Sequence, residues 1–231
     1  MPLPRPIDVL IVAAYPPELS ALGEAFGPHA ISGAFSPEFV GKLGSLEVVA
    51  QAVGVGLSAA AIGATRCLAE WRPRAVFLVG TCGAYPGRGT AVGELVRARR
   101  IHLASTAALE GRAGMPPIVE TERAADARLS QSLGALTARE ADVATTLAVT
   151  TDAALAAAIA ERGECDVEHM EAFSVAGACA AFDVPFGAVL AVANRVGPPG
   201  RDEWKANHRG AEQRAAMAIL HWLERAGNGA L

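Results

Sequence analysis

The sequence contains no apolar run long enough to span a membrane as a helix. Its 231 residues are 52% hydrophobic and 19% charged, yet no apolar stretch approaches the roughly 20 residues that a spanning helix needs. The amino-terminal segment MPLPRP is rich in proline and lacks the apolar core of a signal peptide, so we expect residues 1–6 to be a short disordered lead-in. These absences predict a cytoplasmic protein that does not bind a membrane.

Clusters of like charge and of metal-ligating side chains are also missing. The net charge is −4 with no basic block, which excludes the electrostatic footprint of a nucleic-acid-binding surface. The five histidines have no HExxH spacing, and the absence of a CxxC pair argues against a structural zinc site or a disulfide framework. We expect no metal ion, no cofactor and no nucleic-acid partner. The four cysteines, expected to be reduced, are Cys67, Cys82, Cys165 and Cys179.

Short apolar runs rich in β-branched residues alternate with segments of helical spacing. Runs of the first kind are typical of strands that are buried on both faces. Over 231 residues this alternation predicts one domain, residues 1–231, with a three-layer α/β/α sandwich around a mixed, mostly parallel sheet. Strands are expected at 7–14, 75–79, 93–105, 143–151, 166–170 and 185–193, a hairpin at 38–53, and helices at 18–26, 57–71, 126–136, 153–160, 171–182 and 203–226.

The loops that follow the strands are the expected ligand-binding positions. In parallel sheets of this kind, ligands bind outside the carboxyl ends of the strands. The rule selects the segments 15–18, 54–57, 80–84, 169–171 and 193–201. A fold alone does not name a reaction, so the function depends on the side chains in these segments.

The same segments resemble those of the nucleoside phosphorylase superfamily. The resemblance is greatest to the branch of nucleosidases that act on methylthioadenosine, S-adenosylhomocysteine and futalosine. No single segment is specific, but all of them follow the order of the family and together span nearly the whole chain. They are VAAYPPEL (12–19), VGVGLSAAAIGAT (53–65), VGTCGA (79–84), VEHMEAFSVA (167–176) and VPFGAVLAVANRVGPPGRDEW (184–204).

The resemblance implies a catalytic role for Glu18. Taken alone, Glu18 is an acid at the start of a helix, where the helix dipole favours a carboxylate. In the family, the glutamate at this position holds and deprotonates the water that attacks the anomeric carbon. Water is a poor nucleophile, and a positioned base of this kind accelerates its attack typically 10²–10⁴-fold.

The resemblance also implies the residues that contact the sugar. Glu171 would accept hydrogen bonds from the ribose 2′- and 3′-hydroxyls, and Met170 would lie against the sugar. We count His169 with the substrate-binding residues. We expect it either on the surface or behind the residues that contact the substrate, and we do not expect it to be a catalyst. Small residues near the substrate would be Gly54, Thr81, Cys82 and Gly83.

Hydrolysis and phosphorolysis differ at position 78. Phosphorolytic relatives hold phosphate with an arginine three residues before the hydroxyl of the Gly-Thr-Cys-Gly turn, and with another near the first strand. Here these places hold Leu78, Pro16 and Pro17, with Glu18 following. An anionic nucleophile needs positive charge and paired donors, so the sequence favours water.

Asn194 distinguishes the classes of purine base. Methylthioadenosine nucleosidases carry an aspartic acid here, which protonates N7 of adenine. Asparagine instead offers a donor and an acceptor, which suit O6 and N7–H of a 6-oxopurine. The loop after Asn194 resembles that of futalosine hydrolases. This resemblance implies that Arg201 or Arg195 of this chain would pair with the carboxylate of futalosine.

The sequence departs from the family pattern at two positions. Leu190 replaces a usual arginine, and Ala154 replaces an aromatic residue that stacks on adenine. We expect a homodimer that hydrolyses futalosine to hypoxanthine and dehypoxanthine futalosine, in the alternative menaquinone pathway. Alternatives are a methylthioadenosine or S-adenosylhomocysteine nucleosidase, a purine nucleoside phosphorylase, and a nucleoside-binding protein without catalysis.

Overall fold

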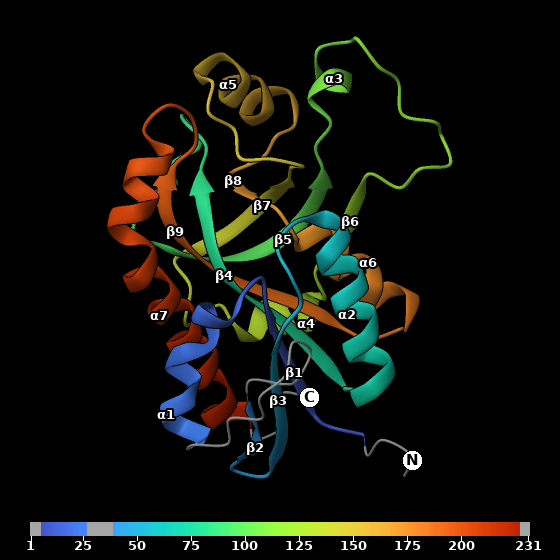
Figure 1. Ribbon diagram of the computed structural model, residues 1–231, viewed down its shortest axis with the longest axis vertical. Helices are drawn as coiled ribbons and strands as arrows, with labels where there is room; N and C mark the ends of the chain where they lie inside the picture. The colour runs from blue at the N-terminus through green and yellow to red at the C-terminus, as the bar shows by residue number, and fades with distance from the viewer. Residues whose placement is uncertain (1–5, 27–38, 227–231) are drawn as a thin grey trace.

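The computed structural model describes residues 6–26 and 39–226, and Figure 1 shows how their helices and strands are arranged. Residues 1–5 of the expected lead-in and residue 38 of the expected hairpin lie outside this part of the chain. The described residues form a nine-stranded sheet. Its strands are β1 (Val9–Ala13), β2 (Phe39–Leu43), β3 (Leu46–Ala52), β4 (Ala75–Ala84), β5 (Leu95–Leu103), β6 (Glu122–Ala124), β7 (Arg139–Thr145), β8 (Val167–His169) and β9 (Phe186–Arg195).

Helices cover both faces of the sheet. Side chains of α2 and α6 share one buried apolar cluster with the strands, and side chains of η1, α4 and α7 share a second. Figure 1 shows α7 on one side of the sheet and α2 with α6 on the other. The predicted layered α/β fold with a mixed sheet is confirmed. The helices are the 3-10 helix η1 (Pro16–Leu22), α1 (Gly23–Phe26), α2 (Leu57–Trp71), α3 (Thr106–Leu109), α4 (Ala127–Ser132), α5 (Ala153–Arg162), α6 (Ala172–Ala181) and α7 (Gly200–Ala226).

The strand order brings the ends of β1, β3, β4 and β9 together. The order is β2-β3-β1-β4-β8-β7-β5-β6, and β9 pairs with both β4 and β5. β1 runs parallel to β3 and β4, and β4 runs parallel to β9. The loops that follow these four strands therefore lie at one edge of the sheet. Within the described ranges, no helix combines the length and apolarity needed to cross a membrane.

The sheet closes on itself at one end, which the alternating pattern of the sequence did not predict. Because β9 pairs with both β4 and β5, the strands β4, β8, β7, β5 and β9 form a ring. β5 reaches both β7 and β9 by a shift of register between Ala98 and Ile101. A register shift of this kind marks a β-bulge, which bends a strand and increases its twist.

Two strands, β4 and β7, differ most from their predicted ranges. β4 continues to Ala84, because the Gly-rich segment expected to be a turn pairs with β9 as far as Arg195. β7 covers 139–145 and not 143–151. Its polar Asp142 is 1% exposed and accepts hydrogen bonds from Arg99 and Arg100 of β5. This pairing is long-range, so hydrophobic periodicity could not place the strand.

The helix ends follow local sequence signals. α2 covers residues 57–71, as predicted, and Asp152 caps α5 by accepting a hydrogen bond from the Leu155 N–H at 2.7 Å. Within α2, a Cβ at Gly63 would lie 2.0 Å from the carbonyl oxygen of Val53. The helix therefore packs directly on the backbone that leads into the loop after β3.

Gly63→Ala is expected to destabilise the protein by about 1–3 kcal/mol, because the added methyl group must displace backbone. The matched change Gly210→Ala lies in α7, where the nearest atom to an added Cβ is the flexible end of Arg214 at 3.4 Å. That change should stabilise the protein by up to about 1 kcal/mol through helix propensity. Urea unfolding of both variants measures the two effects, and equal effects would contradict the packing of α2.

Candidate active site

The Glu18 carboxylate is fixed by backbone N–H groups where β1 and β4 end. Its Oε2 accepts a hydrogen bond from the Ala14 N–H at 2.9 Å, and its Oε1 accepts one from the Thr81 N–H at 3.1 Å. The residue is only 3% exposed. A carboxylate from the first loop is thus held inside the protein against the loop edge of the sheet.

Local sequence explains why Glu18 reaches this position. Tyr15 is extended, and Pro16 with Pro17 then starts η1, where the fixed φ of proline suits the first turn. On β4, a Cβ at position 80 would lie 2.7 Å from Glu18 Oε1. Gly80 therefore provides the space that the carboxylate occupies.

Burial raises the pKa of Glu18 to about 8. The backbone hydrogen bonds from Thr81 and Ala14 act in the opposite direction, and the nearby charge of Glu171 raises the pKa further. A carboxyl group with a pKa near neutrality can take up and release a proton at the pH of the cell. Glu18 therefore has the properties of a general acid or base.

Glu171 supplies a second buried carboxylate, at the junction of β8 and α6. It is 4% exposed, and its Oε1 accepts a hydrogen bond from the Gly56 N–H at 2.7 Å. Gly56 has a φ of +85°, a backbone conformation that favours glycine. The loop after β3 and the segment after β8 are thus joined at the same edge as Glu18.

His169 is 5% exposed and lies behind Glu171, so of its two expected positions it has the one behind the substrate-contacting layer and not the one on the surface. Its Nδ1 accepts hydrogen bonds from the N–H groups of Glu171 and Ala172, at 3.1 and 3.2 Å, and lies 3.1 Å from Glu171 Oε2. Burial lowers the pKa of His169, which favours the neutral ring that can accept at Nδ1. Met170, between the two residues, is half-buried.

The small residues chosen from sequence occupy different environments. Gly54 has a φ of +103° and donates its N–H to the Ala14 carbonyl oxygen at 3.0 Å, beside Glu18. Thr81 is half-buried next to it on β4. Cys82 points away: it is 3% exposed and its side chain packs in the core cluster of α2 and α6. Its thiol is a core group, not a group that lines the site.

Asn194 lies beside Gly83, its partner in register on β4. Its Nδ2 donates to the Arg195 carbonyl oxygen at 2.9 Å. A Cβ at Gly83 would lie 3.0 Å from this Nδ2, and one at Gly200 would lie 3.2 Å from it. The two glycines leave room for the amide, which keeps its Oδ1 and second N–H for other partners.

The site includes contacts that sequence reasoning did not select. The Trp204 Nε1–H of α7 donates to Thr81 Oγ1 at 3.3 Å. The Tyr15 hydroxyl donates to the buried Glu212 of α7, and burial raises the pKa of that phenol. Nothing in the sequence pattern links positions so far apart. Gly56 and Gly80, by contrast, lie in segments already selected, and their glycines were the available signal.

The arginines of the last loop are not drawn into the site. Arg195 pairs with Glu203, and Arg201 is exposed at the start of α7. Among the described side chains, no three His, Cys, Asp or Glu residues gather in a group that could hold a metal ion.

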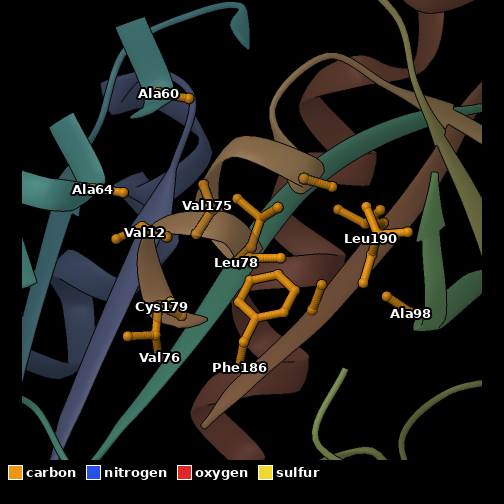
Figure 2. Close-up of a cluster of buried hydrophobic side chains, with 14 of the residues drawn as sticks. Val12, Ala60, Ala64, Val76, Leu78, Ala98, Val175, Cys179, Phe186 and Leu190 are labelled. Atoms are coloured by element: carbon orange, nitrogen blue, oxygen red, sulfur yellow. The ribbon is translucent and has the colours of Figure 1, made fainter. Parts of the chain in front are cut away.

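Two positions that carry arginines in family members are buried in apolar surroundings. Figure 2 shows Leu78 and Leu190 in the cluster formed with Phe186 and Val175, and both leucines are fully buried. An arginine at either position would place its stem in this core. Ala154, which replaces the stacking aromatic residue, is exposed on α5.

Comparison with known proteins identifies the family and the fold of the chain. A family model described as the phosphorylase superfamily matches residues 8–224. No curated protein matches the sequence significantly, but many solved structures share the fold.

Several of these structures are nucleosidases, among them the following three. A variant of the Helicobacter pylori methylthioadenosine nucleosidase with 5′-methylthioadenosine in its active site has a TM-score of 0.84 at 15% identity, over 96% of this chain and 100% of that chain. A futalosine hydrolase mutant from the same species has a TM-score of 0.84 at 16% identity, over 95% and 99%. The methylthioadenosine/S-adenosylhomocysteine nucleosidase of Neisseria meningitidis, with methylthio-immucillin-A, has 0.82 at 21% identity, over 94% and 99%.

Glu18→Gln is expected to stabilise the protein progressively more as the pH rises from 5 to 9. The folded pKa of Glu18, about 8, lies above the ordinary glutamate value of 4.5, so the folded state binds more protons between these values and wild-type stability falls with pH. The difference should reach a few kcal/mol above pH 8. Urea unfolding at pH 5, 7 and 9 measures it, with the exposed Glu224→Gln as control. A difference that does not change with pH would contradict the raised pKa.

Proposed function

The chain belongs to the phosphorylase superfamily, and from that premise we propose that it hydrolyses the N-ribosidic bond of a purine nucleoside. The observation that carries the proposal is the buried Glu18 carboxylate, fixed by the Ala14 and Thr81 N–H groups with its pKa raised to about 8. A base with these properties is needed to activate water, and an anionic nucleophile would be repelled by it.

Glu18 would take a proton from the attacking water. As the water oxygen bonds to the anomeric carbon, the bond to the purine nitrogen breaks and its electron pair leaves with the base. Burial makes the ionised Glu18 a stronger base than a carboxylate in water, because its proton affinity follows its pKa. The fixed N–H groups keep the carboxylate in place while the proton moves.

Glu171 would hold the ribose and stabilise the transition state. Its Oε1 has one backbone hydrogen bond, from Gly56, and a carboxylate oxygen has a further lone pair for a sugar hydroxyl. Positive charge develops on the sugar as the base departs, and a fixed, buried carboxylate favours that charge. The Glu171 carboxylate would itself supply the negative charge for this stabilisation.

Water is favoured over phosphate by the residues around Glu18. Leu78 is buried in the core, and the first loop presents Pro16, Pro17 and the Glu18 carboxylate. Phosphate binding needs cationic, preferably bidentate, donors. The two buried carboxylates, Glu18 and Glu171, create the opposite potential.

We further propose that the base is a 6-oxopurine and the substrate futalosine. The futalosine hydrolase and a methylthioadenosine nucleosidase share this fold with equal TM-scores of 0.84, so the fold does not choose between them. Asn194 supports the 6-oxopurine: with one N–H bound to the Arg195 carbonyl oxygen, it retains an N–H for O6 and an oxygen for N7–H. The exposed Arg201 is available to a carboxylate on the 5′ side.

A homodimer remains part of the proposal. Apolar side chains are exposed around the first turns of α2 and after β7, with Val55 at 59%, Ile62 at 63%, Leu147 at 79% and Val149 at 65%. Exposed apolar side chains of this size mark association surfaces when they are contiguous. The expected cytoplasmic location is likewise kept as a prediction.

The wild-type protein is expected to release hypoxanthine from futalosine at the same rate with and without phosphate. Glu18→Gln should lower kcat by roughly 10²–10⁴-fold, because it removes the base and keeps the shape. Chromatography of the free base measures both effects, with inosine and methylthioadenosine as competing substrates.

Each other outcome identifies an alternative. Base release that requires phosphate indicates a phosphorylase, and release of adenine alone indicates a methylthioadenosine-type nucleosidase. Tight nucleoside binding without release, unchanged by Glu18→Gln, indicates a binding protein. Any of these results would overturn the proposed hydrolysis of futalosine.

Asn194→Ala is expected to lower kcat/KM for futalosine by roughly 10²–10³-fold, as loss of one fixed donor to a developing charge does elsewhere. Asn194→Asp should not restore activity, because a carboxylate oxygen would face the Arg195 carbonyl oxygen that now accepts at 2.9 Å. Steady-state kinetics on both variants test this. Wild-type activity in Asn194→Ala would show that Asn194 does not contact the base.

A further inference from the structure

We propose that the Arg195–Glu203 ion pair is a clip that orients the Asn194 amide and thereby selects a 6-oxopurine over a 6-aminopurine. Arg195 and Glu203 are positioning residues in this proposal, since they act through Asn194. The inference rests on the proposed function, and it assigns the choice of base to a contact outside the buried site.

Glu203 holds Arg195 by both its backbone and its side chain. Glu203 Oε2 accepts the Arg195 backbone N–H at 2.7 Å, and Oε1 accepts the guanidinium Nε–H at 2.8 Å and also an Nη2–H. Hydrogen bonds from Arg195 lower the pKa of Glu203, which favours its charged form. One carboxylate from the first turn of α7 therefore fixes the peptide unit that follows Asn194.

The fixed Arg195 residue in turn determines which way the Asn194 amide points. The Arg195 carbonyl oxygen accepts from Asn194 Nδ2 at 2.9 Å, and a Cβ at Gly200 would lie 2.9 Å from that same oxygen. Gly83 flanks the amide nitrogen on the other side. The nitrogen is thus directed toward backbone, and the amide cannot rotate by 180° without placing Oδ1 against the carbonyl oxygen.

The neighbouring residues do not replace the clip. Ala193 is held through its carbonyl oxygen by Asn207 at 3.0 Å, and the Val196 N–H donates to the Ala84 carbonyl oxygen at 2.8 Å. These bonds fix the chain on either side of Arg195. The Val196 bond fixes the planar peptide unit that contains the Arg195 carbonyl group. The Arg195 N–H, in the preceding peptide unit, bonds to Glu203, so loss of Glu203 frees the peptide unit between Asn194 and Arg195 and lets the amide move relative to that carbonyl.

The two amide orientations would recognise different bases. A 6-oxopurine presents an acceptor at position 6, and a 6-aminopurine presents a donor there. An amide free to rotate can meet either one, whereas a fixed amide leaves one of them unpaired. An unpaired polar group in a binding site is the main source of discrimination between such analogues.

The pair is exposed enough to be removed without unfolding the protein. The Arg195 side chain is 67% exposed and that of Glu203 23%, and exposed ion pairs contribute little to stability. Changes in base selectivity can therefore be separated from changes in folding. The Lys42–Glu47 pair, with side chains 69% and 41% exposed, lies on β2 and β3 and serves as a matched control.

The test compares Glu203→Ala, Arg195→Ala, their double variant, Glu203→Gln and the control Glu47→Gln. Two ratios are measured: kcat/KM for futalosine against its 6-amino analogue, and affinity for free hypoxanthine against adenine by calorimetry. Both ratios should fall by roughly tenfold in Glu203→Ala, the size of one lost specific contact, and by less in Arg195→Ala, whose backbone N–H keeps its bond to Glu203. The double variant should match Glu203→Ala, because that change alone removes every bond of the clip. Glu203→Gln, which retains an acceptor, should recover part of the selectivity, and Glu47→Gln should match the wild type.

Failure of this inference is distinct from failure of the proposed function. If the alanine variants lose activity equally on both nucleosides and keep the affinity ratio, or if their effects add, the clip is overturned and hydrolysis stands. If the wild type releases no base, the proposed function is overturned, and the affinity ratio for the free bases still decides whether the clip selects the base.

Discussion

The burial of the Glu18 carboxylate is the constraint on which the rest of the site depends. An ionised carboxyl group inside a protein is costly unless donors replace its water, and here the Ala14 and Thr81 N–H groups do so. Those donors come from the ends of β1 and β4, so the carboxylate requires these strands to be neighbours. It also requires glycine at position 80, since any Cβ there would occupy its space.

The same constraint explains the chemical character of the site. Glu171 lies close enough to raise the pKa of Glu18, so the site contains two acids with no compensating charge at Leu78. Such a site repels anions and favours a reaction in which positive charge develops. Departure of a purine from ribose is a reaction of that kind, and proton transfer to Glu18 from water is consistent with the raised pKa.

The sequence predicted what depends on local or periodic signals. The ends of α2 and the segments that contribute Glu18, Glu171 and Asn194 follow from apolar periodicity and a family resemblance. The closed ring of strands and the position of β7 did not, because they depend on pairings such as Asp142 with Arg99, between distant positions. Likewise, the sequence placed Cys82 near the site but did not show that its side chain faces the core. The alternation of side chains along β4 continues through a segment that resembles a turn in the sequence.

In the proposed function, the side of the site that contacts the base is held by different contacts from the side that activates water. Glu18 depends on buried backbone contacts, so few substitutions around it are tolerated. Asn194 is half-buried and its orientation depends on a solvent-exposed pair, Arg195 with Glu203. Changes in that pair affect the fold little, because exposed ion pairs contribute little to stability. Under the proposed function, a protein built in this way would change the base it selects through surface residues while the buried carboxylates stay fixed.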